Sequence, residues 1–140
     1  MKILAAHDGS APADQALLFA SEMAQKLGGE LHLVTVVPDL CLSSEEVSPN
    51  ECSLITSSLQ NSAQGGLRKA QEMLAGRGFQ AQTHIKAGRP ADGILDAAEE
   101  IGADMIVVGS QGRHGAKRWL LGSVSTKVAE FAKCKVLIVK

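Results

Sequence analysis

Short apolar runs alternate with longer stretches of helical periodicity along the whole chain, and this alternation restricts the fold more than any other feature. The apolar runs lie at residues 3–6, 30–37, 79–87, 104–109 and 135–140. Between them, apolar residues recur at three- and four-residue steps at 11–27, 55–74, 90–100 and 123–133. Near-continuous apolar strands that alternate with helices are typical of a parallel sheet buried on both faces. We therefore predict an α/β fold of three layers, α/β/α, with an open sheet of five parallel strands.

Residues that favour helix ends and turns separate these elements. Ser10 is a suitable N-terminal cap for the first helix, and Gly28 is a suitable C-terminal cap. Gly65 and Gly66 stand inside the second helical stretch and lower its helix propensity by about 2 kcal/mol. Residues 39–53 are polar and lack periodicity, so we predict a long loop there.

Length and composition are those of one globular domain. The chain has 140 residues, of which 45% are hydrophobic and 21% charged, and we predict a single domain over residues 1–140. A net charge of −1, three Phe and one Trp provide neither a basic surface nor an aromatic platform, so we expect no nucleic-acid partner. The sequence contains neither a long apolar span nor a signal-peptide pattern, so we expect a cytoplasmic protein that does not insert into membranes.

The three cysteines, Cys41, Cys52 and Cys134, form no Cys-x2-Cys pair, so a zinc site is not expected. An odd number of cysteines in a reducing compartment indicates free thiols. Cys134 directly precedes the last apolar run and is expected to pack as a small apolar residue. The sequence therefore predicts three free thiols and no metal ligands among the side chains.

The last third of the chain contains a strand, a glycine-bearing basic loop and a helix start, in that order. Gly109, Gly112 and Gly122 have the spacing Gly-x2-Gly-x9-Gly, and Ser123 follows the last of them. A helix start carries unpaired N–H groups and a partial positive charge, and glycines allow a ligand to approach the backbone. This combination predicts a phosphate site. The alternative is a structural loop without a ligand, because glycine also marks ordinary turns.

The position of this loop in the predicted sheet agrees with a nucleotide site. Two better-known phosphate loops, Gly-x4-Gly-Lys-Ser/Thr and Gly-x-Gly-x2-Gly after the first strand, are absent from the sequence. Ligands of open parallel sheets bind beyond the carboxyl ends of the strands, where the strand order reverses. Asp8 and Gly109 end two such strands. Asp8 is predicted to accept a hydrogen bond from a ribose hydroxyl or the adenine edge; the alternative is a surface carboxylate in an ion pair.

Together these motifs resemble the universal stress protein family, and the resemblance covers the whole chain. The glycine spacing is that of the ATP-binding signature of this family. The other matching motifs are Asp8-Gly9-Ser10, Val36-Val37-Pro38, Gly88-Arg89-Pro90, Asp104-x-Ile106-Val107-Val108-Gly109 and Leu121-Gly122-Ser123-Val124-Ser125. The resemblance implies a Rossmann-like fold of the adenine nucleotide alpha hydrolase type with strand order 3-2-1-4-5. It also implies an adenine nucleotide ligand, namely ATP with Mg²⁺ or Mn²⁺ bridging the phosphates, and a homodimer through the last strand, between Val136 and Val139.

The resemblance also assigns roles to individual positions. In the ATP-binding branch an aspartate after the first strand contacts the nucleoside, a valine near the end of the second frames the adenine, and glycines and serines hold the phosphates. The positions that match here are Asp8, Val36, Gly109, Gly112, Gly122, Ser123 and Ser125. The full set of predicted nucleotide-binding residues is Ala6, His7, Asp8, Val36, Val108, Gly109, Ser110, Gly112, Arg113, Gly122, Ser123, Val124 and Ser125. None of them is predicted to be catalytic.

Several of these residues have a simpler interpretation as well. His7 stands where the family usually has a small or apolar residue, and it is either a packed histidine at the pocket mouth or a proton shuttle. Ser123 is favoured as a plain helix cap, a role that is compatible with phosphate binding. Arg113 is either a solvated loop charge or a phosphate ligand.

Three functions are compatible with the sequence. The first, which we favour, is a nucleotide-dependent homodimeric regulatory module that acts in a stress response on a protein partner not identifiable from the sequence. The second is a slow ATPase or phosphotransferase, and the third is a dimeric interaction protein that binds no nucleotide. Between Gly109 and Lys127 the chain has no Asp or Glu to hold a metal near a γ-phosphate. We therefore expect a protein that is not an enzyme, with weak ATP hydrolysis at most.

Overall fold

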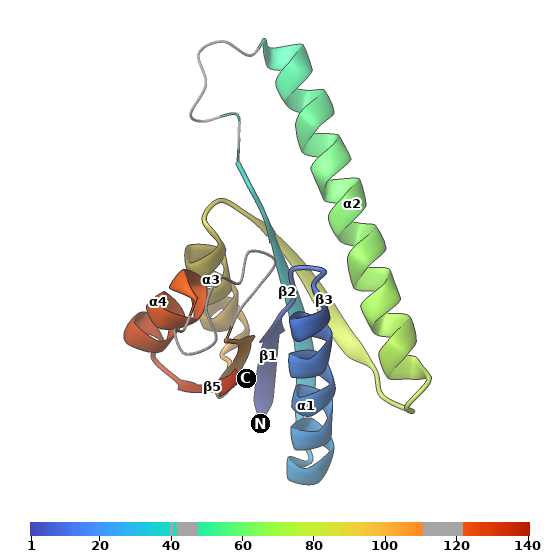
Figure 1. Cartoon of the computed structure of the whole chain (residues 1–140), viewed down its shortest axis with the longest axis vertical. Helices are drawn as coiled ribbons and strands as arrows, with labels where there is room; N and C mark the ends of the chain where they lie inside the picture. The colour runs from blue at the N-terminus through green and yellow to red at the C-terminus, as the bar shows by residue number, and fades with distance from the viewer. Residues whose placement is uncertain (40, 42–47, 111–121) are drawn as a thin grey trace.

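A five-stranded parallel sheet forms the centre of the molecule, with the strand order β3-β2-β1-β4-β5 (Figure 1). The computed structural model describes residues 1–39, 41, 48–110 and 122–140. The strands are β1 (Lys2–Ala6), β2 (Glu30–Val37), β3 (Ala81–Ala87), β4 (Met105–Gly109) and β5 (Lys135–Val139). The predicted fold class and strand order are confirmed.

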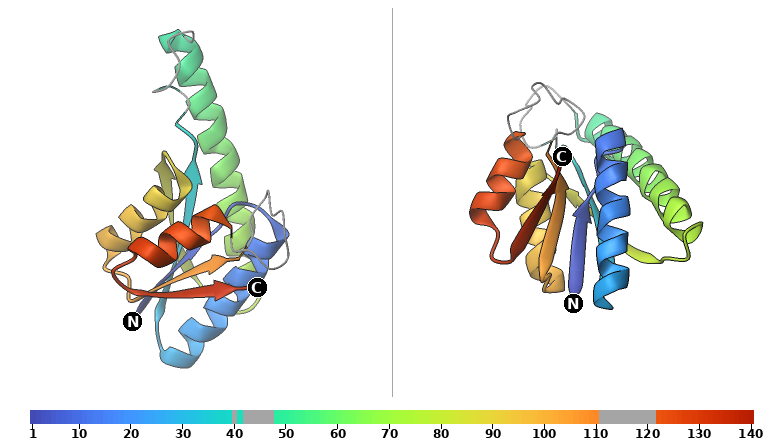
Figure 2. Two further views of the ribbon diagram at one scale, coloured as in Figure 1. Left: turned by 60° about the vertical axis from the view of Figure 1, so that its left-hand side comes forward. Right: turned by 60° about the horizontal axis from the view of Figure 1, so that its bottom comes forward.

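Helices cover both faces of the sheet, so the molecule has the three predicted layers (Figure 2). The helices are α1 (Ala11–Leu27), α2 (Pro49–Ala75), α3 (Pro90–Ile101) and α4 (Ser123–Phe131). Helices α1 and α2 pack on one face and α3 and α4 on the other. Successive side chains of a strand point to opposite faces, so Ile3 belongs to the α1/α2 core and Leu4 to the α3/α4 core. In the described ranges no helix is long and apolar enough to cross a membrane.

Strand β1 lies between β2 and β4, which sets the position of the candidate site. Ala5 of β1 pairs in parallel register with Leu33 of β2 and with Val107 of β4. These strands are buried on both faces, which explains their continuous apolar sequence. Because the strands are parallel, the segments that follow β1 and β4 emerge side by side at the same edge of the sheet.

Helix α2 begins earlier than predicted. The loop was predicted over residues 39–53, and its predicted C-terminal boundary is wrong because residues from Pro49 onward are helical. The side chain of Ser48 accepts a hydrogen bond from the backbone N–H of Glu51 at 3.2 Å and caps the helix. The first turns carry almost no buried apolar residue, so hydrophobic periodicity does not reveal them. The other predicted element ends differ from the observed ones by at most two residues.

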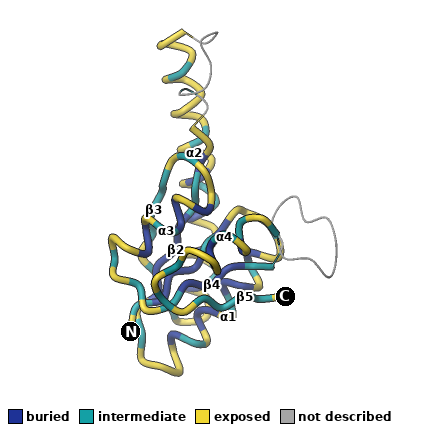
Figure 3. Tube along the Cα trace, turned by 90° about the vertical axis from the view of Figure 1, so that its left-hand side faces the viewer, coloured by how far each residue is buried: buried dark blue, intermediate teal, exposed yellow. Residues whose placement is uncertain are grey.

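The first half of α2 projects beyond the sheet (Figure 3). The buried residues of this helix, Ala63, Leu67, Ala70 and Leu74, all lie in its second half. In the projecting half the side chain of Leu54 is 72% exposed. This part of the helix therefore receives little stabilisation from the core.

Cys41 and Cys52 form a disulfide with their Cα atoms 5.6 Å apart, so the prediction of three free thiols is wrong for this pair. The early start of α2 is the reason, because it brings Cys52 next to the segment that leaves β2. A sequence separation of 11 residues does not indicate that two cysteines lie close together in space. Cys134 is free, and it packs beside the α3/α4 core as predicted.

Candidate functional site

The turn after β1 holds Asp8 at the carboxyl edge of the sheet. Gly9 has a φ of 83°, a left-handed conformation that favours glycine. The backbone N–H of Ser10 donates to Asp8 Oδ1 at 3.0 Å, and the Ser10 hydroxyl donates to the same oxygen. The Ser10 oxygen in turn accepts from the N–H of Ala13 at 3.2 Å, which confirms the predicted cap of α1. Asp8 is therefore an exposed carboxylate whose position is fixed by the turn and by the start of α1.

His7 is buried beneath this turn, and both of its ring nitrogens have partners. Its Nε2 lies 2.7 Å from Asp14 Oδ1, and its Nδ1 accepts from the N–H of Gly9 at 3.2 Å. Since Nδ1 acts as an acceptor, the hydrogen of the neutral ring lies on Nε2 and points to Asp14. This geometry agrees with a packed histidine that supports the turn.

The two ends of the loop between β4 and α4 are joined by a hydrogen bond. The N–H of Ser110 donates to the carbonyl of Val139 at 2.8 Å and extends the ladder between β4 and β5. The N–H of Gly122 donates to the carbonyl of Ser110, also at 2.8 Å. The start of α4 is thereby held at the carboxyl end of β4. Gly112 and Arg113, which are predicted site residues, lie outside the described residues.

Helix α4 begins without a side-chain cap. Its N-cap residue is Gly122, which has no side chain to accept from the first turn, and Ser123 is the first helical residue. The interpretation of Ser123 as the cap is therefore wrong, and its side chain is exposed at the helix start. Backbone N–H groups of an uncapped first turn carry partial positive charge and attract anions. The local chemistry fits a phosphate group.

Two hydroxyl groups, one buried and one exposed, hold the backbone at this helix start. The Ser125 side chain is only 2% exposed, and its hydroxyl donates to the carbonyl of Gly122 at 3.0 Å. The hydroxyl of Thr126 donates to the same carbonyl at 2.9 Å. These contacts orient the backbone of Gly122. Neither Thr126 nor this supporting role of Ser125 was predicted from the sequence, although a hydroxyl residue four positions after a helix cap is a signal for such a contact.

The predicted apolar members of the site belong partly to the core. Val108 is buried in the α3/α4 core, and Ala6, Val36 and Val124 pack against it and are partly buried. Val36 contacts Gly93 of α3 so closely that a Cβ at Gly93 would lie 2.6 Å from its Cγ2. Helix α3 therefore fixes the side chain of Val36 near the carboxyl end of β2.

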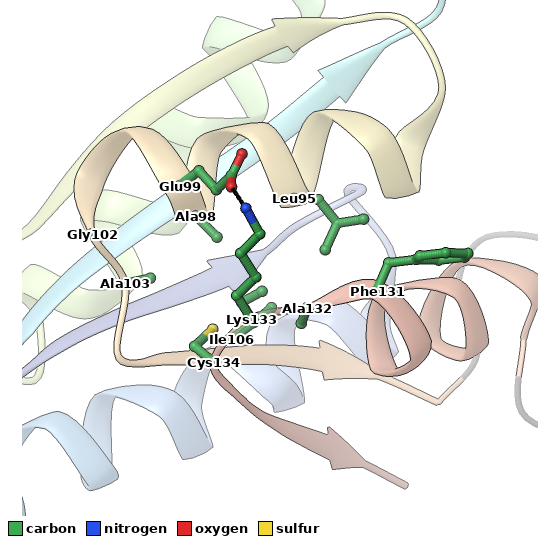
Figure 4. Close-up of a pocket in the computed structure, with 10 residues that line it drawn as sticks. All are labelled: Leu95, Ala98, Glu99, Gly102, Ala103, Ile106, Phe131, Ala132, Lys133 and Cys134. Carbon is green, nitrogen blue, oxygen red and sulfur yellow. Dashed lines mark hydrogen bonds and ion pairs between the residues drawn. The ribbon is translucent and has the colours of Figure 1, made fainter.

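An open cavity of about 340 Å³ lies at the opposite edge of the sheet, between the ends of α3 and α4 (Figure 4). Leu95 and Phe131 line it, and an ion pair between Lys133 and Glu99 spans one side. Cys134 also lines it, and burial raises the pKa of this thiol, which keeps it protonated and weakly nucleophilic. This cavity is remote from Asp8 and from the start of α4, and it is not part of the candidate site.

The structure brings several predicted residues to one edge and shows no metal centre in the parts it describes. The residues at or beside the ends of β1 and β4 and the start of α4 are Ala6, His7, Asp8, Val108, Gly109, Ser110, Gly122, Ser123, Val124 and Ser125. Among the described residues, no three His, Cys, Asp or Glu side chains lie where they could share a metal ion. The arrangement combines a carboxylate with backbone and hydroxyl donors, which suits a ligand with both hydroxyl and anionic groups.

Comparisons with known proteins agree with this geometry. A profile of the universal stress protein family matches residues 1–140. Universal stress protein YxiE of Bacillus subtilis is 35% identical over 145 residues, which cover 99% of this chain and 98% of the relative. The solved structure of universal stress protein UspA from Lactobacillus plantarum has a TM-score of 0.87 at 27% identity, and the match covers 100% of this chain and 97% of that one. A universal stress protein solved in complex with cAMP has a TM-score of 0.74 at 27% identity, with the same coverage of both chains.

Proposed function

Because the chain belongs to the universal stress protein family, we propose that it binds ATP at the edge where β1 and β4 end and acts as a nucleotide-dependent homodimeric regulator in a stress response. The observation that carries this proposal is the uncapped start of α4, held beside the end of β4. The cAMP complex of a similar protein supports an adenine nucleotide as the ligand. We further propose that residues 1–140 form one nucleotide-binding domain and that the protein works in the cytoplasm on a protein partner.

The proposed contacts form three groups, one each for the phosphates, the ribose and the adenine. The phosphates bind the backbone N–H groups of the first turn of α4 and the exposed hydroxyl of Ser123. Gly112 and Arg113 are proposed as further phosphate ligands. The ribose donates a hydrogen bond to Asp8, whose carboxylate is fixed by Ser10. The adenine lies against Val36. Ser125 is buried, so its role is to orient Gly122.

A divalent cation, Mg²⁺ or Mn²⁺, fits this site as a companion of the nucleotide. Mg²⁺ is commonly held by substrate phosphates and water with one or two protein carboxylates. The described residues offer no group of metal ligands, so the phosphates would supply most of the coordination. When bound, the cation would neutralise part of the phosphate charge. The same shortage of carboxylates is the reason why we propose a binding protein and not an enzyme.

Equilibrium binding of labelled ATP to the purified full chain tests the nucleotide proposal. Gly122→Val places a side chain at the start of α4 and is expected to abolish binding. Gly76→Val is the matched control, because Gly76 ends α2 with a φ of −60° that valine can adopt, and it should bind like the wild type. Circular dichroism verifies that both variants fold. Absence of binding by the wild type at millimolar ATP would refute the proposal.

The homodimer is proposed from the free edge of the sheet. Strand β5 is an outer strand, and the residues from Val136 to Val139 are only partly buried in one copy. An apolar outer strand readily pairs with another strand. Light scattering at micromolar concentration should give twice the mass of the 14.6 kDa chain. A mass of one chain would contradict this part of the proposal and leave nucleotide binding unaffected.

A further inference from the structure

The Cys41–Cys52 disulfide joins the segment that leaves β2 to the first turns of α2. Both cysteines are partly exposed, so solvent and small thiols can reach them. The Sγ atom of Cys41 lies 3.5 Å from the carbonyl oxygen of Cys52 and 3.5 Å from Oγ1 of Thr56. The bridge therefore lies against α2 on the projecting half of the helix.

Non-covalent packing on this half of the helix is weak. None of the residues from 49 to 62 is buried, and the buried positions of α2 begin at Ala63. Among the described residues, two kinds of contact hold the projecting half: hydrogen bonds from the N–H groups of Glu51 and Cys52 to Ser48, and the covalent bridge. The disulfide is the stronger of the two, because it restricts the chain covalently.

The sequence of the projecting half does not favour a helix on its own. Residues with low helix propensity are frequent there, namely Ser53, Thr56, Ser57, Ser58, Asn61 and Ser62. Gly65 and Gly66 follow at its base and weaken the connection to the anchored half. Short helices without tertiary packing are marginal in water. Loss of the bridge should therefore allow residues 49–62 to unfold locally while residues 63–75 stay packed.

From these observations we propose that Cys41 and Cys52 form a reversible thiol–disulfide site that controls the order of the projecting half of α2. In the oxidised protein the bridge holds the helix, and in the reduced protein this half opens. The reactant is a small cellular thiol and its disulfide, such as reduced and oxidised glutathione. In the cytoplasm, where we place the protein, thiols are kept reduced, so a bridge at an accessible surface site is expected to respond to oxidation.

Thiol–disulfide exchange between the bridge and glutathione requires no other reactant. A thiolate of the reductant attacks one Sγ atom, the Cys41–Cys52 bond breaks, and a mixed disulfide forms. A second thiolate of the reductant then attacks the mixed disulfide and releases the cysteine. The protein gains two electrons and two protons as two thiols, and two reductant thiols become one disulfide. Oxidised glutathione reverses the same steps.

Hydrogen exchange measured by mass spectrometry on the full chain tests this inference. The protein is equilibrated with oxidised or reduced glutathione, and the state of each cysteine is verified by alkylation. Reduction is expected to accelerate exchange at residues 49–62 by about tenfold or more, with no change at residues 67–75. Equal exchange of residues 49–62 in the two states would overturn the proposal. So would continued alkylation of Cys41 and Cys52 after oxidation, or a disulfide between two chains.

Cysteine variants provide the matched controls. In Cys52→Ser and Cys41→Ser the backbone hydrogens of residues 49–62 should exchange rapidly in both buffers, because neither variant can form the bridge. Cys134→Ser should keep the response of the wild type, since Cys134 lies at the start of β5, outside the bridge. A response that survives in Cys52→Ser would refute the proposal. The measurement uses no nucleotide, so its outcome is independent of ATP binding.

Discussion

Replacing Gly93 with alanine tests how closely α3 packs on the sheet. A Cβ at this position would lie 2.6 and 2.9 Å from the two γ-carbons of Val36 and 3.2 Å from Cβ of Lys86. Val36 is β-branched and lies in an inner strand, so neither its side chain nor its backbone can move without cost. Either Val36 leaves its rotamer or α3 shifts away from β2.

The expected change in stability is the balance of two effects. Overpacking of a core costs about 1–3 kcal/mol, whereas alanine in place of glycine inside a helix gains about 1 kcal/mol. Gly93→Ala should therefore lower the free energy of unfolding by about 0–2 kcal/mol. At Gly66, inside α2, an added Cβ would meet no atom within 4 Å, so Gly66→Ala should raise this free energy by about 1 kcal/mol. The difference between the two variants, about 1–3 kcal/mol, isolates the packing cost.

Urea unfolding followed by circular dichroism measures this difference. With a slope of about 1–3 kcal/mol per molar urea, the two midpoints should differ by about 1 M. A variant Gly93→Ala that is as stable as Gly66→Ala would refute the packing argument. Because Val36 is the residue proposed to lie against the adenine, Gly93→Ala should also weaken ATP binding, and Gly66→Ala should not.

Three further predictions concern stability in urea. Leu74 is 0% exposed, and Leu74→Ala should lower the free energy of unfolding by about 3–5 kcal/mol. Leu54 is 72% exposed, and Leu54→Ala should change this free energy little. Equal effects would contradict the packing described for α2. Ser10→Ala should cost about 1 kcal/mol, because it removes the cap of α1, and an unchanged midpoint would contradict this role. Burial, followed by the nearby His32, lowers the pKa of His84 below its ordinary value of 6.5. His84 therefore takes up a proton more readily in the unfolded chain than in the folded one. As the pH falls through 6.5 towards the lowered pKa, this difference reduces the free energy of unfolding. His84→Gln should flatten the fall in stability between about pH 7.5 and 5.5, and an unchanged slope would contradict this attribution.

The fold could be predicted because its strongest signals are local in the sequence. Strands buried on both faces require unbroken apolar residues, and caps such as Ser10 and Gly28 mark helix ends at fixed offsets. The first turns of α2 could not be found in this way, since they bury nothing. The disulfide was missed for a related reason: Cys41 and Cys52 come together only because the helix begins at Pro49.

The candidate site was predicted only in part. The start of α4 follows from the sequence, because a strand, a glycine-bearing loop and a helical pattern come in that order, but the absence of a side-chain cap was not predicted. The contact between His7 and Asp14 was not predicted, since it depends on the geometry of the turn between them. The contact between His32 and His84 was not predicted either. The pairing of β2 with β3 brings their ring nitrogens to 2.9 Å, although 52 residues separate them in the sequence.

The hydrogen bond between Gly122 and Ser110 has a consequence for the evolution of this scaffold. It joins Ser110, which is anchored by the sheet, to Gly122, whose helix is anchored by Val128 in the core. Substitutions that move the end of β4 can therefore also move the start of α4, although they lie outside that helix. Related chains can thus differ in the position of this helix end through changes in the strand alone, and an engineer could use the same route without altering the helix.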